Sequence, residues 1–151
     1  MPVYNVYPTG TSARPAALLR DLGLLLPIEI HLPVALANLY VGQNKPIPPP
    51  AIGLALVDTG ATVSAVDEKY LTALGLQPMG QGQVSTPAGK QFQNIYLVQM
   101  AFPGTPMPTL QWRVLGMHFQ HGKTIALIGR DFLVNCVLTY NGLMGSYTIC
   151  F

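Results

Sequence analysis

A short segment of the sequence places a carboxylate between an apolar run and a glycine. Residues 52–57 read Ile-Gly-Leu-Ala-Leu-Val, and Asp58, Thr59 and Gly60 follow directly. An unbroken apolar run of this kind is typical of a strand buried on both faces. A carboxylate at its end is costly to desolvate unless it is paired or hydrogen-bonded. Asp58 therefore either starts a turn or takes part in chemistry, and three residues do not decide between the two.

A second segment has the same order of an apolar strand followed by a glycine. Residues 124–128 read Thr-Ile-Ala-Leu-Ile and predict a buried strand that ends at Gly129. Residues 130–135 then predict a short helix, which begins with Arg130 and Asp131.

The elements around these segments are short apolar runs punctuated by glycine and proline, a pattern typical of an all-β domain. A hairpin is predicted over 80–104 with its turn at Pro87, Ala88 and Gly89. Helices are predicted over 33–42 and after Asp67, which would cap its helix. Residues 16–26 stay unassigned. The other predicted strands cover 3–7, 27–32, 62–66, 110–117, 136–140 and 146–151.

Composition narrows the function classes. The 151 residues suit one domain, 1–151, in which 1–26 would be an N-terminal extension or interface arm. Hydrophobic residues make up 50% and charged residues 9%, which excludes disorder as the main interpretation. Net charge is +2 and the eight basic residues are scattered, which argues against a nucleic-acid partner. So few charges favour hiding apolar surface in an oligomer.

The sequence gives little support for a membrane span, a secretory signal, a disulfide framework or a metal site. The charge-free stretches are shorter than the roughly 20 residues of a membrane span and contain proline. Residues 1–10 lack the basic start and apolar core of a secretory signal, and two cysteines make no disulfide framework, so a cytoplasmic location is expected. His118 and His121 lack a third metal ligand of suitable spacing, and we expect no metal and no cofactor.

Taken together and in this order, the Asp58-Thr59-Gly60-Ala61 segment, the hairpin and the Leu127-Ile128-Gly129-Arg130-Asp131 segment resemble the retroviral-type aspartic proteases, the retropepsins. The resemblance covers 28–151 and is nearest to bacterial or cellular-type, single-domain members. It implies an all-β closed barrel with a flap hairpin and one short C-terminal helix, active as a homodimer.

The resemblance also implies a mechanism. This chemistry uses two aspartates around one water, and the chain supplies a single Asp-Thr-Gly, so a second copy would supply the other Asp58. Two carboxylates in contact cannot both be ionised, so the pair would share a proton. One Asp58 would then act as general base on the water while the other, protonated, donates to the scissile carbonyl.

Roles for the neighbouring residues follow from the same resemblance. Thr59 would link the two active-site loops through its hydroxyl, Gly60 would let the substrate backbone approach, and Ala61 matches the retroviral type. Gly129 would pack beneath the loop, and Arg130 and Asp131 would support it. Flap residues that bind substrate would be Thr86, Pro87, Ala88, Gly89 and Lys90.

Arg130 is charged in an apolar setting and needs partners. Retroviral relatives supply an acid shortly after the Asp-Thr-Gly-Ala motif, whereas Thr62 and Val63 stand there in this sequence. Asp21, Asp67 or a backbone carbonyl remain the candidate partners.

Three functional hypotheses stay open. The first is an aspartic endopeptidase with an apolar groove lined by Val84, Ala88 and Ile128, which would favour apolar substrate side chains. The second is a non-catalytic peptide-binding or scaffold module on the same fold, since a fold does not define a function. The third is a self-processing precursor that loses its first twenty or so residues.

Overall fold

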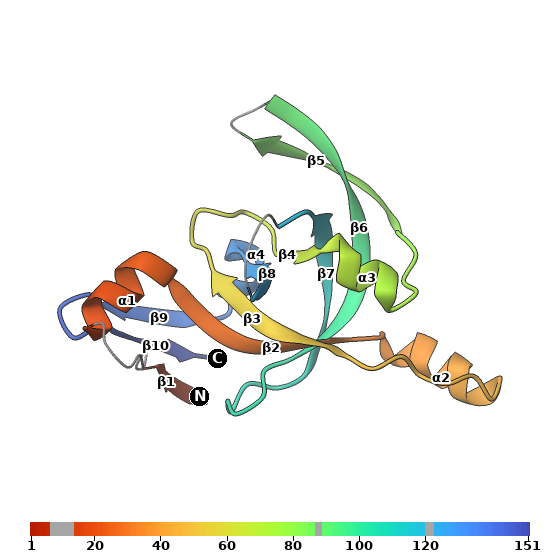
Figure 1. The fold of residues 1–151 in the computed structure, drawn as a ribbon, viewed down its shortest axis with the longest axis horizontal. Coiled ribbons are helices and arrows are strands. Elements are labelled where there is room, and N and C mark those ends of the chain that lie inside the picture. Colours follow the sequence, from red (N-terminus) through yellow and green to blue (C-terminus); the bar gives the residue numbers. More distant parts are fainter. Residues whose placement is uncertain (7–13, 87–88, 120–122) are drawn as a thin grey trace.

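The computed structural model describes residues 1–6, 14–86, 89–119 and 123–151, and these are mostly β-structure with few helices (Figure 1). The strands are β1 (Val3–Val6), β2 (Leu24–His31), β3 (Ala51–Val57), β4 (Ala65–Asp67), β5 (Gly80–Thr86), β6 (Gly89–Ala101), β7 (Leu110–Met117), β8 (Thr124–Ile128), β9 (Val137–Asn141) and β10 (Ser146–Cys150). The helices are α1 (Pro15–Leu22), α2 (Val34–Gly42), α3 (Glu68–Ala73) and α4 (Arg130–Leu133).

The larger sheet orders its strands β2-β3-β8-β4-β7-β6-β5 in the part of the chain that is described. Strand β6 is long enough to pair with three neighbours, and its far end also pairs with β2, where Glu29 lies opposite Ala101. The hydrogen-bonded pairs therefore run in a continuous circuit through β2, β3, β8, β4, β7 and β6. Strand β5 lies outside that circuit and forms a hairpin with β6 that arches away from the body (Figure 1).

One pairing within the circuit matters most for the two sequence segments singled out above. Strands β3 and β8 are parallel neighbours, with Val57 opposite Ile128. The residues that follow these two strands, Asp58 and Gly129, consequently emerge at the same edge of the sheet.

A second, smaller sheet joins the two ends of the chain. Strands β1 and β9 flank β10, and both pair with it in antiparallel register. Helix α1 packs on the β9–β10 turn so closely that a Cβ at Gly145 would lie 2.1 Å from the carbonyl carbon of Pro15. Residues 1–6 and 14–26 thus contribute one strand, one helix and the start of β2.

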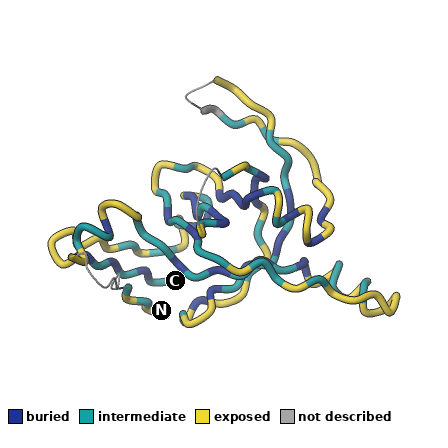
Figure 2. Tube along the Cα trace, in the orientation of Figure 1, coloured by how far each residue is buried: buried dark blue, intermediate teal, exposed yellow. Residues whose placement is uncertain are grey.

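The core lies inside the circuit of strands. Its buried side chains come from β2, β3, β4, β6, β7 and β8 of the larger sheet and include Ile28, Met100 and Ile128, each at 0% exposure. Figure 2 shows this buried interior beneath the exposed hairpin and beside the exposed helix α2. Phe132 from α4 is also fully buried and packs against Phe102, Trp112 and Phe151, with ring centroids 5.3–5.6 Å apart.

Most sequence-predicted elements are present, and several bounds need correction. Residues 16–26 form most of α1 and the first residues of β2. Strand β2 therefore begins at Leu24 and not at Pro27. The predicted strand at 62–66 is confirmed only from Ala65, because the Thr62 carbonyl accepts a hydrogen bond from the Asp131 amide instead of from a neighbouring strand. Strand β3 is not buried on both faces, since Ile52 is 68% exposed.

No helix in the described ranges is both long and apolar enough to cross a membrane.

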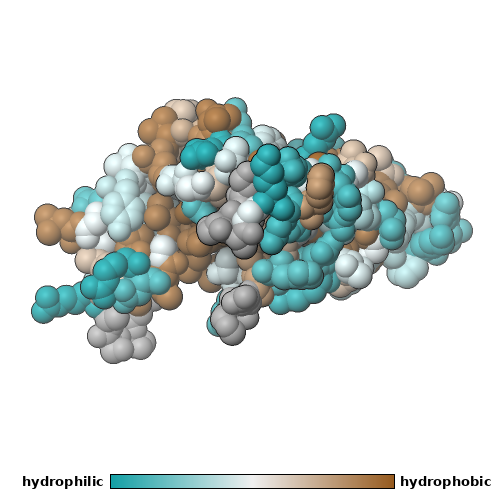
Figure 3. Space-filling model, turned by 90° about the horizontal axis from the view of Figure 1, so that it is seen from above, coloured by the Kyte–Doolittle hydropathy of each residue, from teal (hydrophilic) through white to brown (hydrophobic). Residues whose placement is uncertain are grey.

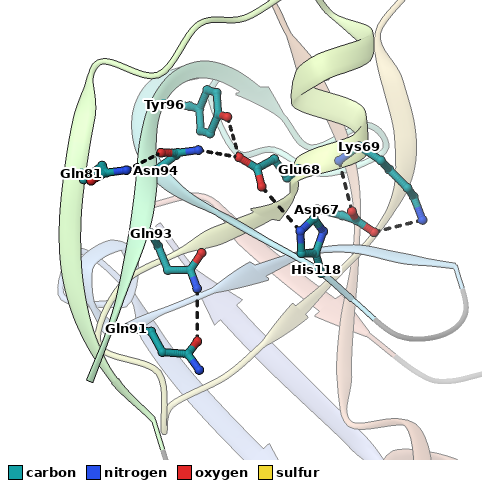
Figure 4. A network of polar contacts seen from close by, with 9 residues as sticks. All are labelled: Asp67, Glu68, Lys69, Gln81, Gln91, Gln93, Asn94, Tyr96 and His118. Atoms are coloured by element: carbon teal, nitrogen blue, oxygen red, sulfur yellow. Dashed lines mark hydrogen bonds and ion pairs between the residues drawn. The ribbon is translucent and has the colours of Figure 1, made fainter. Parts of the chain in front are cut away.

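Helix α3 is attached to the sheet by a polar network around Glu68 (Figure 4). Asp67 caps the helix by accepting a hydrogen bond from the Lys69 amide, as predicted. Glu68 accepts hydrogen bonds from the Tyr96 hydroxyl at 2.7 Å and from the Asn94 amide at 2.8 Å, and His118 lies 3.7 Å from its other oxygen. The Tyr96 and Asn94 hydrogen bonds hold the pKa of the Glu68 carboxyl below its ordinary value of 4.5, with a smaller contribution from His118.

Acid should therefore weaken the protein partly through Glu68. Its folded-state pKa is lowered, so its stabilisation is present above the ordinary pKa of 4.5 and is lost as the pH falls through the lower folded value. Tyr96→Phe removes the larger cause of the shift. We expect this change to reduce the free energy of unfolding by about 1 kcal/mol at neutral pH and to flatten its fall in acid. Urea unfolding between about pH 7 and pH 3 measures both effects.

Tyr140→Phe is the matched control, because the Tyr140 side chain is exposed. The same pH profile for Tyr96→Phe and the unmodified protein would contradict the role given to Glu68.

Candidate active site

Asp58 stands where β3 ends, at the edge of the sheet that it shares with Gly129. Its backbone amide donates to the Ile128 carbonyl at 3.0 Å, which extends the β3–β8 pairing by one residue. The next residues turn sharply, and the Ala61 amide donates back to the Asp58 carbonyl at 3.2 Å. The loop therefore presents the Asp58 side chain at the end of a rigid strand.

The loop orients the Asp58 carboxylate through one of its two oxygens. Oδ1 accepts hydrogen bonds from the backbone amides of Gly60 at 2.8 Å and Ala61 at 3.3 Å. None of the residues that the structure describes donates to Oδ2. A Cβ at position 60 would lie 3.1 Å from Oδ1, so glycine is the residue that leaves this carboxylate uncrowded.

Helix α4 fits against the underside of this loop. The amides of Arg130 and Asp131 donate to the carbonyls of Ala61 and Thr62 at 2.9 and 3.1 Å. Gly129 approaches the loop most closely, and a Cβ there would lie 2.7 Å from the Val63 carbonyl carbon. The position predicted for Gly129, beneath the Asp58 loop, is the one that the structure has.

The Arg130 side chain also contacts the loop. Its guanidinium donates to the Thr59 carbonyl at 3.3 Å and to the Thr62 hydroxyl at 2.9 Å. Of the three candidate partners, the backbone carbonyl is therefore correct. Asp21 instead pairs with Arg20, and Asp67 with Lys69. The apolar setting expected for Arg130 is wrong, because the residue is exposed on the surface of α4.

Ser64 is a supporting residue that the sequence did not single out. Its side chain is fully buried, donates to Asp131 Oδ1 at 2.8 Å and accepts from the Gly129 amide at 3.0 Å. Asp131 also accepts from the Ser64 amide at 2.9 Å and from the Trp112 indole nitrogen at 3.0 Å. The only sequence signal was a small polar residue inside a predicted strand, where a buried hydroxyl must find partners.

A pocket of about 660 Å³ opens beside Asp58 and under the β5–β6 hairpin. Most of its wall is apolar, and Arg113 is the one described cation in the lining. Its lining residues are Asp58, Gly60, Ala61, Thr62, Val63, Gly82, Gln83, Val84, Ile95, Arg113, Val114, Leu115, Met117 and Leu127. Val84 lines it as predicted, whereas Ile128 does not, because alternation along β8 turns Ile128 into the core and leaves Leu127 on the pocket side.

The hairpin predicted over 80–104 is present as the antiparallel pair β5 and β6. Thr86 ends β5 opposite Gly89, the first residue of β6, and Lys90 is exposed. Gly89 has a φ of 111°, a conformation that favours glycine. The predicted tip residues Pro87 and Ala88 lie outside the described residues.

The remaining candidates do not join this site. Cys136 is half-buried, and burial raises the pKa of its thiol to about 11, so the thiol stays protonated at neutral pH. His31 contacts Glu29 and His118 contacts Glu68, while His121 lies outside the described residues. The described ranges contain no group of three or more side chains suited to holding a metal ion.

Comparison with known proteins gives structural similarities alone. No protein-family profile matches the sequence, and no curated protein matches it significantly. The solution structure of simian foamy virus (mac) protease is 18% identical, with a TM-score of 0.45 over 74% of this chain and 92% of that one. EIAV protease, complexed with the inhibitor HBY-793, is 20% identical, with a TM-score of 0.42 over 56% of this chain and 76% of that one.

The close approach at Gly129 predicts a large cost for the smallest side chain. Gly129→Ala forces the Val63 and Ser64 backbone away from α4, because the new Cβ would lie 2.7–2.9 Å from their atoms. We expect a loss of about 1–3 kcal/mol in the free energy of unfolding, measured with urea. Gly80→Ala is the control, since nothing lies within 4 Å of a Cβ at that position. Equal stability of the two variants would contradict the close packing.

Ser64→Ala removes the hydroxyl that joins Gly129 to Asp131. The Gly129 amide then lies buried without its acceptor, and we expect a loss of about 1–3 kcal/mol. Thr62→Val is the control, because Thr62 is exposed and its hydroxyl serves only the exposed Arg130 guanidinium. The ordering expected in thermal and urea unfolding is that Ser64→Ala loses clearly more stability than Thr62→Val; the reverse order would contradict the network.

Proposed function

We propose that this chain is a retropepsin-like aspartic endopeptidase of the single-domain, bacterial or cellular type, with Asp58 as its catalytic residue. The observation that carries the proposal is the state of the Asp58 carboxylate. One oxygen is held by the backbone amides of Gly60 and Ala61, the other receives no hydrogen bond from the described residues, and Asp58 is among the residues that line the pocket. An oriented carboxylate of this kind is suited to accept a proton from water.

The other acidic residues differ from Asp58 in where their ion-pair and hydrogen-bond partners come from. Asp21, Glu29 and Asp67 pair with basic side chains, while Glu68 and Asp131 accept hydrogen bonds from neighbouring elements. Asp58 is the acid whose hydrogen-bond donors all come from its own loop. This contrast supports a chemical role for Asp58 and structural roles for the rest.

We propose a homodimer as the working form. One chain carries one Asp-Thr-Gly loop, whereas hydrolysis of this type needs two carboxylates, so a two-fold axis beside the loop would supply the second Asp58. Thr59 is exposed at that loop, and in the proposed dimer its hydroxyl would meet its counterpart. The role of interface arm for residues 1–26 belongs to the same proposal.

Exposed apolar side chains on the smaller sheet support such an association. Val137 is 53% exposed, and the β9–β10 turn exposes Leu143 at 92% and Met144 at 63%. Figure 3 shows hydrophobic surface toward the end of the molecule where Figure 1 places this turn. Covering these side chains would lower the free energy of the assembly by removing apolar surface from water.

The proposed reaction uses the two carboxylates in different protonation states. The ionised Asp58 takes a proton from the water, whose oxygen attacks the scissile carbonyl carbon, while the protonated Asp58 donates a hydrogen bond to the carbonyl oxygen. The proton then passes to the leaving amine as the peptide bond breaks. In this proposal the β5–β6 hairpin, with Thr86, Gly89 and Lys90 at its described end, covers the extended substrate, and the circuit of strands corresponds to the closed barrel.

Asp58→Asn should abolish cleavage and leave the assembly intact, because the amide cannot accept the proton but fits the same loop. A diverse peptide mixture is incubated with each protein between about pH 4 and pH 7, and products are identified by mass spectrometry. We expect cuts with the unmodified protein that disappear with Asp58→Asn. Sedimentation of both proteins should give the mass of a dimer.

Two outcomes separate the alternatives. No cuts at any pH from a protein shown to be dimeric would favour a non-catalytic peptide-binding module. Cuts that survive in Asp58→Asn would remove Asp58 from the mechanism.

A further inference from the structure

Arg113 brings into the pocket that holds Asp58 a positive charge that has no partner among the described residues. The residue lies in the middle of β7, opposite Leu97 of β6, and is exposed. Its neighbours in the pocket lining are mostly apolar, among them Val63, Val84 and Leu115. A cation in such a wall marks a place where a ligand of opposite charge would be favoured.

No acid of this chain neutralises Arg113. Five of the six acidic residues are engaged elsewhere, and the described residues offer the Arg113 guanidinium neither an ion pair nor a side-chain hydrogen bond. The sixth acid, Asp58, receives its hydrogen bonds from its own loop. The N–H donors of the Arg113 guanidinium therefore remain available. Two of them can bind the two oxygens of a carboxylate through parallel hydrogen bonds.

The other basic residues are placed differently. Arg20 and Lys69 have acidic partners, and Arg130 binds the Asp58 loop. Lys123 lines a separate hollow beside Ile52. Arg14, Lys45 and Lys90 are exposed and line neither pocket, so Arg113 is the described basic residue that shares a pocket with Asp58.

We infer that Arg113 selects peptides that place an acidic side chain, Asp or Glu, in this pocket next to aliphatic residues. The apolar part of the wall would accept the aliphatic side chains, and the guanidinium would bind the carboxylate. This inference rests on the proposed function and refines it, because the pocket walls alone would favour wholly apolar substrates.

The first test is selection from a random peptide library whose members all end in a C-terminal amide, so that only side chains carry carboxylates. Asp58→Asn protein binds the library without cutting it, and the bound peptides are sequenced by mass spectrometry. We expect Asp or Glu to be enriched at one position beside aliphatic residues. With Asp58→Asn/Arg113→Gln protein, this enrichment should disappear.

The second test measures affinity for a matched pair of selected peptides that differ only in Glu or Gln at that position. We expect the Glu peptide to bind about three- to fivefold more tightly to Asp58→Asn protein, the range for a partly hydrated charge pair, with the difference shrinking as salt is added. Arg113→Gln in the same background should remove the difference, and Arg113→Glu should reverse it in favour of a Lys peptide. Lys45→Gln, an exposed charge outside both pockets, should leave it unchanged.

A third arm repeats the measurement with a free C-terminal carboxylate on the Gln peptide. If that carboxylate restores the affinity in an Arg113-dependent manner, the pocket recognises a chain end and the inference about side chains is wrong. The inference is also wrong if no peptide binds, if acidic residues are not enriched, or if the enrichment survives Arg113→Gln.

These results are distinguishable from a failure of the proposed function. Arg113-dependent binding of acidic peptides without any cleavage by the unmodified protein would overturn the peptidase proposal and support this inference. Asp58-dependent cleavage with no preference for acidic peptides would do the opposite.

Discussion

The parallel pairing of β3 with β8 is the constraint on which the rest of the site depends. Because Val57 lies opposite Ile128, β3 and β8 end at the same edge of the sheet. The two segments that follow these strands must therefore turn away from the sheet close to one another. The segments that follow β3 and β8 pack so closely that a Cβ on Gly129 would have no room beside the backbone of Val63 and Ser64. The Ser64 hydroxyl donates a hydrogen bond to Asp131 and accepts one from the Gly129 amide, so these polar groups have partners within the packed region. The loop that carries Asp58 is thus supported by backbone hydrogen bonds from the start of α4 and by the side chains of Ser64, Arg130 and Asp131.

Scarcity of charge makes the roles of several charged side chains identifiable. With six acidic residues in 151, an acid that is not engaged in holding the fold together is easy to recognise. Asp131 joins α4 to β7 through Trp112, and Glu68 joins α3 to β6 through Tyr96. Asp58 accepts hydrogen bonds from its own loop through one oxygen, and it is among the residues that line the pocket. The same comparison among the basic residues distinguishes Arg113 from the others.

Local sequence predicted many of the elements because their boundaries are marked by local chemistry. Strands β7 and β8 have the predicted bounds, since each apolar run ends at a residue or loop that cannot continue it. The cap at Asp67 was likewise predictable, because a short carboxylate before a helix satisfies a free backbone amide. The prediction at 62–66 was wrong over its first half, where Thr62 and Val63 are β-branched but the Thr62 carbonyl accepts a hydrogen bond from the Asp131 amide of α4. Propensity describes what a segment favours alone, whereas the partner of its backbone groups depends on what lies beside it.

The sequence by itself determined the two segments that matter, the order in which they occur, and the hairpin between them. It also indicated an all-β chain with very few charges. Only the tertiary structure decided that the two segments meet through parallel strands. It also decided that Arg130 lies on the surface and binds Thr59 and Thr62, and that Ser64 is buried. Only the fold placed Arg113 in the pocket with Asp58. The physical reason is that spacing along a chain determines periodicity and local hydrogen bonds, whereas contacts between residues some seventy positions apart depend on which strands become neighbours in the sheet.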